Sequence, residues 1–168
     1  MKILGLCGSL QASSSNRTLL ETAASLAPEG VELVLYDGLR ALPQFDPDLD
    51  ARGAPAEVAE LRTQLAGADA LMITCPEYGH SMPGSLKNAI DWVIGSGELE
   101  QKIVAITAAV SHPERGRLGL GALRGTLGAV SARVVGGEPI VRGDEGRPQI
   151  AALLESLIAA VRAERDVT

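Results

Sequence analysis

The chain has 168 residues, of which 46% are hydrophobic, so we expect one compact domain spanning residues 1–168. A net charge of −6 without any Lys/Arg cluster argues against a nucleic-acid partner and against attraction to a membrane surface. No apolar run approaches the roughly 18 residues of a membrane-spanning helix, which predicts a cytoplasmic protein with no membrane partner.

Apolar runs and helical periodicity alternate along the chain, and each change of period is marked by Gly, Pro, Ser or Asp. Each helical stretch follows a strand and precedes the next, which indicates parallel strands joined by helical crossovers. The predicted elements, in order, are strand Lys2–Cys7, helix Asn16–Leu26, strand Val31–Leu35, loop Asp37–Pro55, helix Ala56–Leu65, strand Ala68–Cys75, helix Gly84–Val93, strand Lys102–Ala109, helix Leu118–Val130, strand Arg133–Val135 and helix Gln149–Ala163.

This alternation predicts an α/β fold, a doubly wound five-stranded parallel sheet with helices on both faces. We favour the flavodoxin-like strand order 2-1-3-4-5, whose switch point lies between the first and third strands. The long loop of residues 37–55 could carry a subunit contact. The tail from Arg165 to Thr168 is expected to be frayed. Cys7 and Cys75 lie at strand ends, where a thiol is usually a small buried hydrophobe, and no Cys/His spacing indicates a metal site.

The loop after the first strand, from Gly8 to Arg17, offers three consecutive serines and Asn16 at a helix N-terminus. Hydroxyl, amide and backbone N–H donors gathered there suit a phosphate group, with Arg17 as the nearby cation. The alternative is that Ser14 or Ser15 only caps the helix. The loop matches neither the P-loop nor the dinucleotide-binding fingerprint, since the required later glycines are missing.

The loop after the third strand, beginning at Pro76, follows a buried run and ends in an amphipathic helix. Its prolines and glycines expose backbone N–H and C=O groups, which suit the edge of a flat heterocycle. Tyr78 could add an apolar contact and His80 a polar one, whereas Trp92 is interpreted as a core residue. Glu77 is either solvated or held by a helix N-terminus. The alternative is that this segment is an ordinary connection shaped by its prolines.

Together, the motifs Gly8-Ser9-Leu10…Ser15-Asn16-Arg17 and Pro76-Glu77-Tyr78…Pro83-Gly84…Leu86-Lys87-Asn88-Ala89-Ile90-Asp91-Trp92 resemble the NADPH-dependent FMN reductase family, a group that includes chromate, quinone and azo-dye reductases. The resemblance covers essentially the whole chain. It implies a flavodoxin-like fold, non-covalently bound FMN, and a homodimer or homotetramer with the FMN site near a subunit interface.

Carried over by position, the resemblance places Ser9, Ser15, Asn16 and Arg17 around the FMN phosphate and the segment Pro76, Glu77, Tyr78 and Gly79 along the ring. Ser111 would belong to a third loop after the fourth strand. Two departures stand out, because family members commonly carry Arg where this chain has Gln11 and often Asn where it has Gly79. The expected cofactor-binding set is Ser9, Gln11, Ser15, Asn16, Arg17, Pro76, Glu77, Tyr78, Gly79, His80 and Ser111.

The function implied is an FMN-dependent oxidoreductase with NADPH or NADH as co-substrate, working by a ping-pong mechanism. Hydride would pass from the nicotinamide to flavin N5 and then to a small-molecule acceptor such as a quinone, free flavin, azo dye or metal oxyanion. No protein side chain is expected to be catalytic, because the flavin carries the chemistry. Two alternatives are a flavodoxin-like FMN electron carrier and a flavin-binding protein without turnover.

Overall fold

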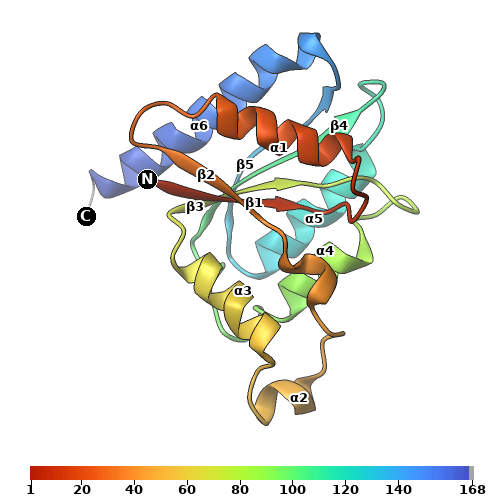
Figure 1. The fold of residues 1–168 in the computed structure, drawn as a ribbon, viewed down its shortest axis with the longest axis vertical. Helices are drawn as coiled ribbons and strands as arrows, with labels where there is room; N and C mark the ends of the chain where they lie inside the picture. Colours follow the sequence, from red (N-terminus) through yellow and green to blue (C-terminus); the bar gives the residue numbers. More distant parts are fainter. Residues whose placement is uncertain (167–168) are drawn as a thin grey trace.

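The computed structural model describes residues 1–166 and is built on a parallel five-stranded sheet in the order β2-β1-β3-β4-β5 (Figure 1). The strands are β1 (Lys2–Cys7), β2 (Glu32–Tyr36), β3 (Ala70–Thr74), β4 (Ile103–Val110) and β5 (Arg133–Val141). The helices are α1 (Ser15–Ser25), α2 (Pro47–Ala51), α3 (Ala56–Ala66), α4 (Gly84–Asp91), α5 (Arg117–Ala129) and α6 (Arg147–Arg165), with short 3₁₀ turns at Gly38–Ala41 and Asp144–Gly146. The predicted flavodoxin-like strand order is confirmed.

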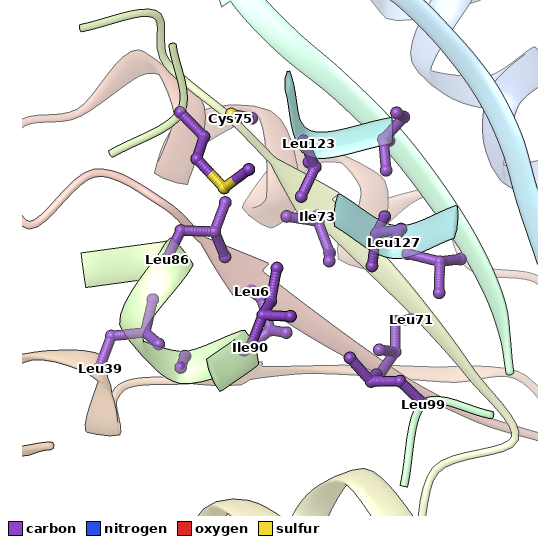
Figure 2. Close-up of a cluster of buried hydrophobic side chains, with 14 of the residues drawn as sticks. Leu6, Leu39, Leu71, Ile73, Cys75, Leu86, Ile90, Leu99, Leu123 and Leu127 are labelled. Carbon is purple, nitrogen blue, oxygen red and sulfur yellow. The ribbon is translucent and has the colours of Figure 1, made fainter. Parts of the chain in front are cut away.

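Helices cover both faces of the sheet, with α1 and α6 on one side and α3, α4 and α5 on the other (Figure 1). Side chains of a strand alternate between faces, so Leu71 and Ile73 of β3 pack on the α3–α5 side while Met72 packs under α1 and α6. Figure 2 shows Ile73 beside Leu123 of α5, and Leu71 further along the strand beside Leu99. Because both faces are buried, the central strands read as continuous apolar runs.

Strand β5 is longer than the predicted Arg133–Val135. Gly136 and Gly137 both have positive φ, at +71° and +113°, and they form an irregularity after which pairing with β4 resumes at Pro139. Because β5 is an edge strand, a proline there removes no bond needed by another strand. The prediction therefore ended this strand too early, because two glycines and a proline are typical of a strand's end.

The predicted loop of residues 37–55 contains a 3₁₀ turn and α2. The Asp46 carboxylate accepts hydrogen bonds from the backbone N–H groups of Asp48, at 2.8 Å, and Leu49, at 3.4 Å, and Pro47 occupies the first helical position. Asp and Pro residues that are typical of loops thus also start this short helix. In Figure 1, α2 projects away from the rest of the molecule.

Helix α6 continues to Arg165, so the prediction of a frayed end is wrong for this residue. The Arg165 guanidinium pairs with the Asp69 carboxylate at 2.6 Å, and the Asp166 N–H donates to the Arg162 carbonyl. The remaining tail residues, 167 and 168, lie outside the described residues. Within residues 1–166, no helix is long and apolar enough to cross a membrane.

Candidate functional site

The loops that follow β1 and β3 are bonded to each other at the carboxyl edge of the sheet. The Gly8 N–H donates to the Thr74 carbonyl at 2.8 Å, and the Ser85 hydroxyl donates to the Gly8 carbonyl at 3.3 Å. A Cβ at position 8 would lie 3.0 Å from the Thr74 oxygen and 3.2 Å from Pro76. Glycine therefore permits the close approach of the two loops that the sequence predicted to meet at the switch point.

In the first loop, Ser14 is the residue that caps α1, since its hydroxyl accepts the Asn16 N–H at 3.2 Å. The buried Asn16 side chain uses its Oδ1 to accept the Ala109 N–H at 3.0 Å, which ties the start of α1 to the end of β4. Its Nδ2 is the atom left to donate to an anion. Ser15 is the first helical residue and is free of the capping role.

Arg17 is turned towards the end of β2, where it pairs with Asp37 at 2.5 Å and with Glu21 at 3.0 Å. The hydrogen bond to Asp37 is the main reason that the pKa of Arg17 is raised. Gln11 bonds within its own loop, because its side chain donates to the Ser13 hydroxyl and its N–H to the Ser9 hydroxyl, both at 3.3 Å.

The predicted first-loop residues do not all line the same cavity. Ser9, Gln11 and Arg17 line a cavity of about 390 Å³ on the β2 side of the loop. Ser15 lines a different cavity, on the β4 and β5 side. The first loop thus divides its polar side chains between two sides of the cleft.

The second loop turns sharply between Tyr78 and Ser81. The Tyr78 N–H donates to the Ser81 carbonyl at 2.9 Å and the Ser81 N–H donates back at 3.1 Å. Between them, Gly79 and His80 have φ values of +58° and +62°, the pattern of a type I′ turn. Tyr78 is 53% exposed, and its hydroxyl lies 3.5 Å from that of Ser9.

Glu77 is held by a helix N-terminus, which decides between its two interpretations. Its Oε2 accepts the N–H groups of Leu118, at 2.9 Å, and Gly119, at 3.1 Å, in the first turn of α5. A Cβ on Gly119 would come within 3.1 Å of the Glu77 backbone. Helix α5 therefore fixes the second loop in place.

Trp92 is a core residue, as predicted. It is fully buried, its indole N–H donates to the Pro43 carbonyl at 2.8 Å, and Phe45 packs edge-on at 5.1 Å between ring centres.

Lys87 and Asp91, also on the segment after β3, form an ion pair at 2.6 Å on the outer face of α4.

Both cysteines are free and buried, as their interpretation as small hydrophobes requires. Burial, with the nearby charge of Glu77, raises the pKa of the Cys75 thiol to about 12. Across residues 1–166, no group of three or more His, Cys, Asp and Glu side chains gathers that could hold a metal ion.

The second and third loops enclose a cavity of about 530 Å³, within the size range of small-molecule sites. The polar and loop residues that line it include Pro76, Glu77, His80, Ser111, Arg115 and Arg142. Four of the predicted residues, Pro76, Glu77, His80 and Ser111, are thus brought to one cavity. Tyr78 and Gly79 lie at the tip of the turn and do not line it.

Arg142 is a residue that sequence reasoning missed, because the strand leading to it was predicted to end at Val135. Its N–H donates to the Val110 carbonyl at 2.9 Å, which places it beside the third loop. Its guanidinium Nη1 lies 3.5 Å from the Ser15 hydroxyl. Together with Ser15 it also lines the cavity of about 270 Å³ on the β4 and β5 side. The sequence offered no specific signal for it, because Gly136, Gly137 and Pro139 are typical of the end of a strand.

The donor set at this edge fits the FMN that the resemblance implies. The Ser15 hydroxyl and the Arg142 guanidinium suit a phosphate, because both can donate hydrogen bonds. The cavity between the second and third loops joins this region at Arg142 and Ala109. A phosphate donor set therefore adjoins a cavity suited to a flat ring.

Among curated proteins, an NAD(P)H-dependent FMN reductase of Pseudomonas aeruginosa is 40% identical over 119 residues, which cover 71% of this chain and 63% of that relative. A quinone reductase of Escherichia coli K12 is 37% identical over 94 residues, covering 55% of this chain and 50% of the relative. The matched segments thus span 50% to 63% of these relatives' own length, which is less than two thirds.

Among solved structures, a flavoenzyme NAD(P)H:(acceptor) oxidoreductase from Paracoccus denitrificans superposes with a TM-score of 0.79 at 24% identity, covering 94% of this chain and 97% of the other. The apo form of an NADH:FMN oxidoreductase superposes with a TM-score of 0.73 at 20% identity, covering 95% and 89%. At these identities the likeness concerns the fold. Residues 1–146 match the family described as NADPH-dependent FMN reductase, and the chain therefore belongs to that family.

Proposed function

We propose that this chain is an NAD(P)H-dependent FMN reductase that passes reducing equivalents to a small-molecule acceptor by a ping-pong mechanism. The observation that carries the proposal is the convergence of three loops around adjoining cavities, in a chain that belongs to this family. The acceptor class is a quinone, free flavin, azo dye or metal oxyanion. The quinone is favoured, because several relatives are named for that activity.

In this proposal the first loop holds the phosphate. Ser15 offers a hydroxyl and Asn16 its Nδ2, while the N-terminal turn of α1 adds its dipole. Ser9 contributes from the other side of the loop and also positions the Tyr78 hydroxyl. Of the predicted phosphate residues, Arg17 contributes least, since Asp37 and Glu21 already neutralise its charge.

The second and third loops line the ring and exclude water from one side of it. The backbone from Pro76 to His80 is held by the turn at Gly79 and by the anchor of Glu77 on α5, so its N–H and C=O groups are oriented before binding. Ser111 adds a hydroxyl from the third loop. When bound, FMN would supply the hydride chemistry at N5, and no side chain is assigned a proton-transfer role.

The test is steady-state oxidation of NADH and NADPH by the FMN-loaded protein, with and without a quinone. The proposal expects turnover that requires FMN and increases with quinone concentration, with parallel lines in double-reciprocal plots. A carrier would instead show slow turnover and accumulate one-electron-reduced flavin during photoreduction. A flavin-binding protein without turnover would bind FMN and leave both nicotinamides unoxidised, and either result would contradict the proposal.

We further propose a homodimer or homotetramer. Among residues 1–166, three large apolar side chains are more than half exposed: Tyr78 at 53%, Ile94 at 51% and Leu118 at 56%. Tyr78 and Leu118 both flank Glu77, so they lie at the rim of the cleft. The projecting α2 supplies a second surface for association. We also propose a cytoplasmic location, which suits two free buried cysteines.

A further inference from the structure

We propose that Arg142, which directly follows β5, supplies the full positive charge to the FMN phosphate. The inference rests on the proposed function. It assigns the charge to a residue outside the first loop, which approaches Ser15 from the end of β5.

The cations on the β2 side of the first loop, Arg17 of the loop and Arg40 of the turn after β2, are already engaged elsewhere. Arg17 has two carboxylate partners, Asp37 at 2.5 Å and Glu21 at 3.0 Å. Arg40 donates to the Leu10 carbonyl at 2.5 Å. Gln11 is neutral and bonds to the Ser13 hydroxyl. The β2 side of the loop therefore has little positive charge to offer a phosphate.

Arg142 is in the opposite situation. Within residues 1–166 it forms no ion pair, and its one side-chain hydrogen bond is the long contact of 3.5 Å with the Ser15 hydroxyl. Asp144 lines the same cavity but does not pair with it. A guanidinium beside the first residue of α1 adds its charge to the positive end of the helix dipole, and both attract an anion.

The backbone holds Arg142 firmly in this place. Its N–H bonds to Val110, and the chain then turns at Gly143, whose φ is +108°. A Cβ on Gly146 would lie 2.4 Å from the Val141 carbonyl oxygen, so the 3₁₀ turn that follows Arg142 packs closely against the end of β5. Arg142 lines both cavities, at the point where they adjoin. A phosphate bound between Ser15 and the ring cavity would therefore accept hydrogen bonds from the planar Arg142 guanidinium.

The test compares FMN with riboflavin, which lacks the phosphate, by titrating each into apo-protein and following flavin fluorescence. Arg142→Gln should raise the Kd of FMN roughly tenfold or more and leave that of riboflavin within about twofold. It should also flatten the salt dependence of FMN binding. Arg142→Lys, which keeps the charge without the fork, should fall between the parent and the Gln variant. Arg147→Gln tests a competing cation, since Arg147 lines the same 270 Å³ cavity. Arg52→Gln is the matched control, because it removes an equal charge from an exposed residue next to α2 and should leave the Kd of FMN within about twofold.

Three results would overturn the assignment. Equal weakening of FMN and riboflavin by Arg142→Gln would mean that Arg142 acts on the ring or on the fold. A loss in Arg147→Gln or Arg52→Gln as large as that in Arg142→Gln would mean that the charge comes from another contact or from a diffuse field, and not specifically from Arg142. Unchanged FMN affinity in both Arg142 variants would place the charge elsewhere. Failure of the parent to bind either flavin is a different outcome, because it would contradict the proposed function itself.

Discussion

Two neighbouring residues at the tip of the second loop, Gly79 and His80, both adopt the left-handed backbone region. Asn tolerates this region, whereas a β-branched residue is strained in it. Open space surrounds the Gly79 Cα, so a side chain there meets no neighbour and only the backbone conformation matters. The Asn that the family often carries at this position would keep the same turn.

We therefore predict that Gly79→Asn leaves the free energy of unfolding and FMN affinity nearly unchanged, while Gly79→Val lowers stability by about 1–3 kcal/mol. Urea denaturation of both variants beside the parent measures the first quantity, and FMN titration the second. Equal stability of the Asn and Val variants would show that the turn is not as constrained as its φ values indicate.

Gln11 allows a prediction about the choice of nicotinamide. The residue is exposed and lacks the permanent charge that could bind the 2′-phosphate of NADPH. We expect the parent to use NADH and NADPH with nearly equal kcat/KM, and Gln11→Arg to raise the NADPH preference roughly tenfold in a salt-sensitive way.

Measuring kcat/KM for both nicotinamides together with FMN affinity separates two roles of position 11. If Gln11→Arg tightens FMN and leaves the nicotinamide ratio unchanged, the position faces only the FMN phosphate. A strong NADPH preference in the parent would contradict the prediction and would point to another cation, such as Arg115.

Sequence reasoning brought predicted residues to one cavity where a motif and a strand end coincide. Pro76, Glu77, His80 and Ser111 follow β3 and β4, and they line one cavity as a parallel sheet requires. Sequence could not show that Arg17 pairs with Asp37, a partner twenty residues away on another loop. Such a contact depends on side-chain direction, which periodicity does not report.

At the scale of elements, Asp69 joins three parts of the fold. It precedes β3, accepts the Lys2 N–H of β1 at 2.7 Å and pairs with Arg165 of α6 at 2.6 Å. Partial burial disfavours its ionised form, but the bonds from Lys2 and Arg165 outweigh this and lower the pKa of Asp69. A depressed pKa gives stability that is present near neutral pH and is lost as the pH falls through the folded-state pKa.

Asp69→Asn should therefore be less stable than the parent at neutral pH, and the difference should shrink as acid protonates Asp69 in the parent. Urea unfolding at several pH values tests this. Glu155→Gln, in the exposed middle of α6, is the control and should show no such convergence. A stability difference for Asp69→Asn that stays constant from neutral to acid pH would contradict the assignment.

The sheet order could be predicted because the apolar runs and the crossover rule leave few arrangements. The second half of β5 could not, since Gly136, Gly137 and Pro139 are residues that usually end a strand. Helix α2 was missed for a related reason, because its start at Asp46 and Pro47 also reads as a turn. Both predictions failed at residue types that occur in two kinds of backbone: Gly and Pro in β5, and Asp and Pro at the start of α2.

For the whole molecule, we predict self-association. Leu118 is exposed at the start of α5 beside the cleft, where a partner subunit would cover it. Sedimentation at micromolar concentration should show a dimer or tetramer, and Leu118→Glu should shift it towards the monomer because a charge would be buried at the contact. A parent that sediments only as a 17.4 kDa species would contradict the proposal.

Anaerobic mixing of the FMN-loaded protein with NADH or NADPH, followed by addition of a quinone, tests the proposed reductase activity directly. We predict that one equivalent of nicotinamide bleaches the oxidised-flavin absorbance and that one equivalent of quinone restores it. The Ser15→Ala/Asn16→Ala double variant should lose FMN during preparation, since each lost donor to the charged phosphate weakens binding roughly tenfold or more. Flavin that stays oxidised after either nicotinamide is added to the parent would contradict the assignment of a reductase.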